Sequence, residues 1–75
     1  MTTMKGFLRR RLAKGLKGFR GDQSQSQFAR KLGIAPGSLN RFENRVQNVT
    51  IDTLEKLCRS LNCDIADLFP PLKEE

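Results

Sequence analysis

The chain has 75 residues and a formal net charge of +6, and 37% of its residues are hydrophobic. A chain of this length forms one small domain, which excludes a second domain and an enclosed catalytic cleft. Its hydrophobic fraction is enough for a compact helical core, and no segment approaches the ~18 consecutive apolar residues of a membrane-spanning helix.

Charge is distributed unevenly along the chain. Residues 1–45 contain 11 Lys and Arg but only 2 Asp and Glu, whereas residues 46–75 contain 3 and 6. Such an asymmetry predicts that one end of the molecule faces a polyanion, and the alternative is an ordinary solvated surface.

The sequence offers little for catalysis or metal binding. It contains no histidine, and the spacing of Cys58 and Cys63 is neither a CxxC motif nor a zinc pattern. Both cysteines lie among apolar residues, which predicts buried free thiols and a reducing compartment. The basic N-terminus lacks the apolar core of a signal peptide. We therefore expect a cytoplasmic protein that is not an enzyme and needs no metal or cofactor.

The first predicted helix begins near Phe7, after a flexible arm over residues 1–5. Apolar residues recur at steps of four and three and mark one face, while the other face is basic. A break near Gly15 is left open, because glycine weakens a helix by ~1 kcal/mol relative to alanine. The apolar positions are Phe7, Leu8, Leu12, Leu16 and Phe19. The basic positions are Lys5, Arg9, Arg10, Arg11, Lys14, Lys17 and Arg20.

Two further helices are predicted on either side of a tight turn. Ser24 and Gln27 fit a capping box, so the second helix starts there and runs to about Leu32. Gly33 suits the left-handed residue that ends a helix, and Pro36 suits the first turn of the next one. In a basic chain, two short helices in this arrangement predict a helix-turn-helix that reads a DNA groove. The residues expected to face inward are Phe28, Ala29, Leu32, Leu39 and Phe42.

The C-terminal third predicts two more helices. Thr50 caps the fourth helix, and Asn62 is its expected C-terminal stop. Asp64 caps a short fifth helix over residues 65–69, which the prolines that follow must end, leaving residues 70–75 as a tail. The fourth helix is expected to bury Ile51, Leu54, Leu57, Cys58 and Leu61. The sequence as a whole predicts a single all-α domain over residues 1–75, with five short helices and no strand.

Several of these segments together resemble one known family. The matching residues are Ser24-Gln25, Phe28-Ala29, Leu32-Gly33-Ile34, Leu39 and Phe42-Glu43-Asn44. In combination they look like the phage-repressor and Cro type of helix-turn-helix, the XRE family, and the likeness extends over residues 16–69. The resemblance implies the five-helix lambda-repressor-like fold, with the third helix, about residues 36–44, in the major groove of DNA.

The resemblance also implies a set of contact residues. Pro36 and Gly37 offer no side-chain donor at the start of the third helix, so base contacts fall to Ser38, Asn40 and Arg41. A guanidinium can bond both acceptors of a guanine edge, and an asparagine amide can read an adenine edge. The expected contacts to the DNA backbone are Ser24, Gln25, Gly37, Asn44, Arg45, Gln47 and Asn48. Glu43 is expected to form a structural ion pair with Arg20. Arg45 stands where the family commonly has a glycine.

These observations predict a sequence-specific DNA-binding transcriptional regulator, and a repressor is the favoured kind. One module reads only a few base pairs, so a homodimer is expected, paired through Leu68, Phe69 and Leu72. The alternatives are an antitoxin, a prophage repressor, a controller protein of a restriction–modification system, or a protein-interaction module of the same fold. The basic face of the first helix has four open interpretations, namely flanking phosphate, a minor groove, a membrane surface, or solvated charge.

Overall fold

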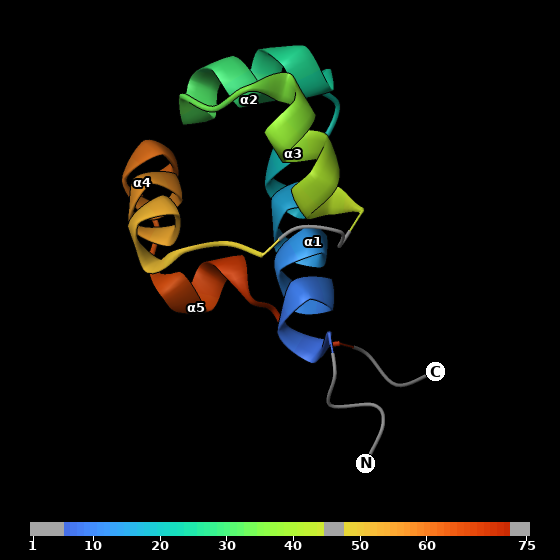
Figure 1. Ribbon diagram of the computed structural model, residues 1–75, viewed down its shortest axis with the longest axis vertical. Coiled ribbons are helices and arrows are strands. Elements are labelled where there is room, and N and C mark those ends of the chain that lie inside the picture. The colour runs from blue at the N-terminus through green and yellow to red at the C-terminus, as the bar shows by residue number, and fades with distance from the viewer. Residues whose placement is uncertain (1–5, 45–47, 73–75) are drawn as a thin grey trace.

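Five α-helices follow one another in the part of the chain that the computed structural model describes, residues 6–44 and 48–72. They are α1 (Phe7–Arg20), α2 (Gln25–Leu32), α3 (Pro36–Glu43), α4 (Ile51–Leu61) and α5 (Ile65–Leu68). Figure 1 shows α1 running along the long axis of the molecule, where it packs against α3 and α5, while α2 packs against α3 and α4. No strand occurs within the described residues, and the predicted all-α, five-helix fold is confirmed.

The helix ends are where the local sequence signals predict them. Ser24 Oγ accepts a hydrogen bond from the amide of Gln27 at 3.1 Å, and Gln27 Oε1 accepts one from the amide of Ser24 at 3.1 Å. These two bonds complete the predicted capping box of α2. Thr50 Oγ1 caps α4 in the same way, and Gly33 and Asn62 end their helices with φ of 74° and 53°. Each of these signals depends on residues within four positions of one another.

The hydrophobic core lies where all five helices meet. Its buried residues are Leu12, Leu16, Phe28, Ala29, Leu32, Leu39, Phe42, Leu57 and Leu68. Three residues predicted to face inward are exposed instead, since Leu8 retains 59% of its accessible surface, Ile51 76% and Phe19 37%. Leu8 and Phe19 lie near the two ends of α1, and Ile51 is the first residue of α4. The helical spacing is correct in each case, but the side chains at these positions stay exposed.

Gly15 lies where α1 and α5 come closest together. α1 continues through this glycine without a break. A Cβ atom built on Gly15 would lie 2.1 Å from the carbonyl oxygen of Leu68 and 2.7 Å from its carbonyl carbon. The backbone of α5 can therefore approach α1 only because residue 15 has no side chain.

We expect Gly15→Ala and Gly18→Ala to change stability in opposite directions. Both glycines lie inside α1, but a Cβ on Gly18 has nothing within 4 Å. Gly18→Ala should raise the free energy of unfolding by up to about 1 kcal/mol through helix propensity. Gly15→Ala should lower it by about 1–3 kcal/mol, because α5 must move away from α1. Urea unfolding of both variants measures this, and equal shifts would contradict the close approach.

Residues 69–71, which follow α5, are hydrogen-bonded to side chains of α1. The guanidinium of Arg11 donates to the carbonyl oxygens of Phe69 and Pro70, the latter at 3.1 Å, and the ammonium of Lys14 donates to that of Pro71 at 2.8 Å. Leu68 is completely buried in the core. Its predicted place on a dimer surface is wrong, because the side chain is fully covered within one protomer.

Candidate nucleic-acid interface

The helix-turn-helix is built by α2, the turn at Gly33 and α3. The amides of Gly33 and Ile34 donate to the carbonyls of Arg30 and Ala29 at 3.1 and 3.0 Å, which closes the end of α2. α3 then starts at Pro36, as predicted. Its inner face is buried through Leu39, Phe42 and Glu43. Its outer face exposes Gly37, Asn40, Arg41 and Asn44, and Ser38 is half-buried.

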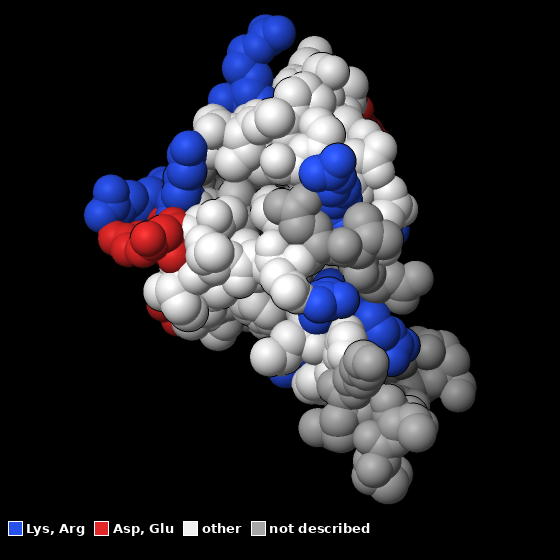
Figure 2. All heavy atoms as spheres, viewed as in Figure 1, with Lys and Arg blue, Asp and Glu red and all other residues white. Residues whose placement is uncertain are grey.

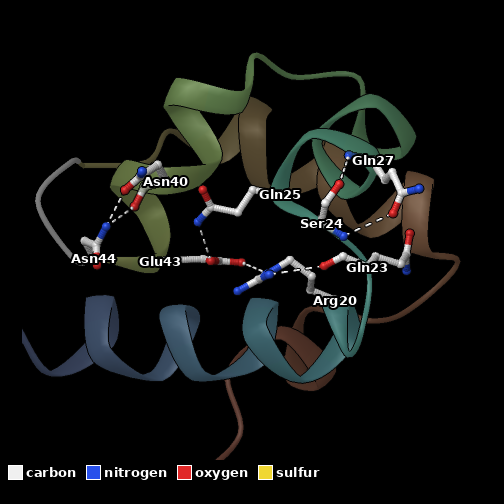
Figure 3. A network of polar contacts seen from close by, with 8 residues as sticks. All are labelled: Arg20, Gln23, Ser24, Gln25, Gln27, Asn40, Glu43 and Asn44. Atoms are coloured by element: carbon white, nitrogen blue, oxygen red, sulfur yellow. Dashed lines mark hydrogen bonds and ion pairs between the residues drawn. The ribbon is translucent and has the colours of Figure 1, made fainter.

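Glu43 links α3 to both preceding helices. It is 2% exposed, and its Oε2 accepts from Arg20 Nε at 2.9 Å, so the ion pair that the sequence predicts is present. Its Oε1 accepts from Gln25 Nε2, also at 2.9 Å. Arg20 also donates to the carbonyl oxygen of Gln23 at 3.1 Å. Figure 3 shows these side chains meeting between α1, α2 and α3. The network fixes α3 against α2 and therefore fixes which residues α3 presents outward.

Two asparagines lie one turn apart at the exposed end of α3. Asn44 Nδ2 donates to the backbone carbonyl of Asn40 at 2.9 Å and also contacts the Asn40 Oδ1 atom. Figure 3 shows this contact between the two side-chain amides. The Nδ2 donors of Asn40 do not take part in these two contacts. An amide presented in this way suits an edge with a hydrogen-bond acceptor.

The structure brings most of the predicted contact residues to one part of the molecule. Ser24 and Gln25 lie at the start of α2, Gly37, Ser38, Asn40 and Arg41 lie on α3, and Asn44 is the residue that caps the end of α3. Arg45 and Gln47, which were predicted to contact the DNA backbone, lie outside the described residues. Asn48 follows this gap and contacts the guanidinium of Arg9 through its Oδ1 atom. Sequence reasoning missed this contact, because 39 residues separate the partners.

The charged side chains are also distributed unevenly over the surface of the folded protein. Figure 2 shows Lys and Arg side chains over α3 and along the N-terminal half of α1, with no acidic side chain among them on this face. On the opposite margin, positive and negative side chains lie together. That mixed cluster belongs to α4, where Asp52, Glu55, Lys56 and Arg59 line one shallow depression. The α3 side is therefore the one suited to a polyanion.

The cysteines are free thiols, as predicted, but they are half-buried rather than fully buried. Burial, with a smaller contribution from Cys58, raises the pKa of Cys63 to about 11. The Cys63 thiol is therefore protonated at neutral pH and is a poor nucleophile. Among the described residues no group of three His, Cys, Asp or Glu side chains is placed to hold a metal ion. In the same residues no helix is both long and apolar enough to cross a bilayer.

Comparison with known proteins gives one consistent result. The Cro/C1-type HTH DNA-binding domain family matches residues 20–72. The chain is 33% identical over 57 residues to the antitoxin HipB of Escherichia coli K12, covering 69% of this chain and 65% of HipB. It is 32% identical over 59 residues to the antitoxin PezA of Streptococcus pneumoniae, covering 76% of this chain and 37% of PezA. The chain thus spans about a third of PezA and just under two thirds of HipB.

A solved structure with the same arrangement of helices is also known. The hypothetical transcription factor NHTF from Neisseria superposes with a TM-score of 0.75 at 27% sequence identity, covering 85% of this chain and 76% of that one. The family match includes α2, the turn, α3, α4 and α5, and it begins at the last residue of α1. The chain therefore belongs to the Cro/C1-type family of helix-turn-helix DNA-binding domains.

Proposed function

We propose that this protein represses transcription by placing α3 in the major groove of a specific operator. The observation that supports this most strongly is the Glu43 network, which holds the inner face of α3 while its outer face carries exposed Asn40 and Arg41. A recognition helix must be rigid so that its side chains meet base edges in a fixed register. The protein acts by binding, without a catalytic step, and works in the cytoplasm.

The side chains divide into two roles in this proposal. Arg41 reads a guanine, Asn40 reads an adenine, and Ser38 touches a phosphate or a thymine methyl. Gln25 binds a phosphate at the start of α2, where free backbone amides also favour an anion. Its amide has two N–H donors, and the bond to Glu43 uses only one of them. The remaining backbone contacts come from Ser24, Gly37, Asn44, Arg45, Gln47 and Asn48.

We expect Arg41→Ala and Gln25→Ala to have different effects on specificity. Arg41→Ala should cost about 1–3 kcal/mol on the preferred site and relax one base position. Gln25→Ala should weaken binding to all sequences about equally, because a phosphate contact carries no sequence information. Selection of bound duplexes from a random pool, performed with each variant, measures both profiles. An unchanged profile for Arg41→Ala would show that base readout lies elsewhere.

A homodimer completes the proposal, because one α3 reads only a few base pairs and repressors of this type read paired half-sites about one turn apart. Phe69 and Leu72 remain partly exposed and stay in the proposed interface, while buried Leu68 does not. Ending the chain before Leu68 would remove part of the core, so truncation is not a clean test. Sedimentation of the full chain, alone and with a selected duplex, measures the number of protomers.

An antitoxin role is a second candidate, favoured by the names of the HipB and PezA relatives. The two functions are compatible, because a chain that opposes a toxin can also bind DNA through α3. Depleting the protein in its host separates them. Growth arrest would indicate a toxin left unopposed, whereas altered transcription with normal growth would indicate a repressor alone.

A further inference from the structure

The basic residues of α1 fall into two groups with different surroundings. Arg11 and Lys14 donate to backbone carbonyls of residues 69–71, and Arg20 pairs with Glu43, so these three hold the fold together. Arg9, Arg10 and Lys17 are exposed, and among the described residues none of the three is in an ion pair with a carboxylate. Within residues 6–44 and 48–72, folding has therefore left these three positive charges without a carboxylate partner.

Arg9 and Arg10 lie at the edge of the proposed interface. Arg9 contacts Asn48, which follows α3 in the chain and is itself a proposed contact to the DNA backbone. Arg10 lines a shallow depression together with Lys17 and with Glu43 at the end of α3. Figure 1 shows the first turns of α1 continuing past the end of α3, and Figure 2 shows basic side chains over that region. The positive surface thus extends beyond the helix-turn-helix on one side.

We propose that Arg9 and Arg10 form a second DNA contact, which binds phosphates of the duplex flanking the half-site that α3 reads. The occupant follows from charge and position, because a duplex lying against α3 and Asn48 carries one phosphate per ~3.4 Å of each strand past that edge. The matched family region begins at residue 20, so this contact is a feature of the α1 turns that precede it. The inference rests on the proposed function, since the phosphates are placed by α3.

The contact carries no base information and acts through electrostatics alone. Each phosphate neutralised by an arginine adds about −0.9 to the slope of log K against log salt concentration. Two arginines in each of two protomers then contribute a slope of about −3.6. The contribution should appear only when the duplex is long enough to include the flanking phosphates.

The test compares two double variants on two lengths of duplex. Arg9→Gln with Arg10→Gln removes two charges from α1 and keeps similar helix propensity. Lys56→Gln with Arg59→Gln removes two charges from α4, which lies apart from α3 and makes its main contacts with α2 and α5. The short duplex holds only the two half-sites selected from a random pool. The long duplex adds about five base pairs, roughly 17 Å, at each end.

We expect the full-length wild-type chain to bind the long duplex more tightly than the short one. The α1 variant should lose this difference, bind the long duplex at least about tenfold more weakly at 0.1 M salt, and show the shallower salt slope. The α4 variant should keep the preference for the long duplex and the wild-type salt slope. The charges that it loses are screened from DNA that lies more than ~10 Å away. Arg10→Gln alone should give about half of the change in slope, and it leaves the contact between Arg9 and Asn48 intact.

Several outcomes would overturn the inference while leaving the proposed function standing. One such outcome is that the wild-type chain binds both duplexes with equal affinity. Another is that the α1 variant and the α4 variant show the same affinities and the same salt slope. A third is an α1 variant that binds DNA normally but loses binding to phosphatidylglycerol vesicles, which would make α1 a membrane-facing helix. Failure of the wild-type chain to bind any duplex would instead reject the proposed function itself. Circular dichroism melting of each variant ensures that only folded proteins are compared.

Discussion

Raising the salt concentration from 50 to 200 mM should weaken DNA binding by this protein about 500-fold. The estimate assumes five phosphate contacts per dimer, each adding about −0.9 to the slope of log K against log salt concentration. The two arginine contacts proposed for α1 would make this slope steeper. Fluorescence anisotropy with a labelled duplex over this range measures the slope.

The same titration distinguishes DNA binding from a protein-interaction module of the same fold. A module that recognises a protein through apolar contacts would meet DNA only weakly and without a preferred sequence. A slope near zero with tight binding, or no binding at 50 mM salt, would rule out a phosphate-facing α3. A competitor duplex of unrelated sequence serves as the control, because nonspecific binding shares the salt slope but not the affinity.

Glu43→Ala should lower the free energy of unfolding by about 3 kcal/mol. The carboxylate is 2% exposed and accepts bonds from both Arg20 and Gln25, so its removal leaves two donors without their partner. The side chain of Arg20 is 26% exposed and can partly turn to water, which keeps the loss at the lower end for buried pairs. Urea unfolding followed by circular dichroism measures the change.

The surface pair of Glu55 and Arg59 is the matched control for this variant. These side chains are 57% and 78% exposed and form an i,i+4 ion pair on α4. Glu55→Ala should cost no more than about 0.5 kcal/mol, because water screens the pair. Similar losses for Glu55→Ala and Glu43→Ala would show that the network does not fix α3. Glu43→Ala protein that remains folded should also bind its operator more weakly, since α3 is no longer held against α2.

The sequence alone determined the helix boundaries to within about one residue and located the helix-turn-helix. The capping box of Ser24 and Gln27, the left-handed Gly33 and the cap at Thr50 are all local, so each can be inferred from a few neighbouring residues. The family pattern adds the ion pair of Arg20 and Glu43, which spans 23 residues. The spacing of apolar residues also identified the apolar face of each helix, but it does not indicate how much of that face other helices cover.

Only the tertiary structure decided which residues of a face are buried and which charges are used. Leu12 and Leu8 lie on the same stripe of α1, yet only Leu12 has other helices packed over it. In the sequence, Gly15 indicates a possible break in the helix. In the structure, a glycine is required at this position because the backbone of α5 lies too close for a side chain. The basic residues of α1 look alike in sequence, but the chain after α5 engages Arg11 and Lys14 and leaves Arg10 exposed. The physical reason is that burial and ion pairing depend on residues far away in the chain, whereas capping and periodicity depend on neighbours.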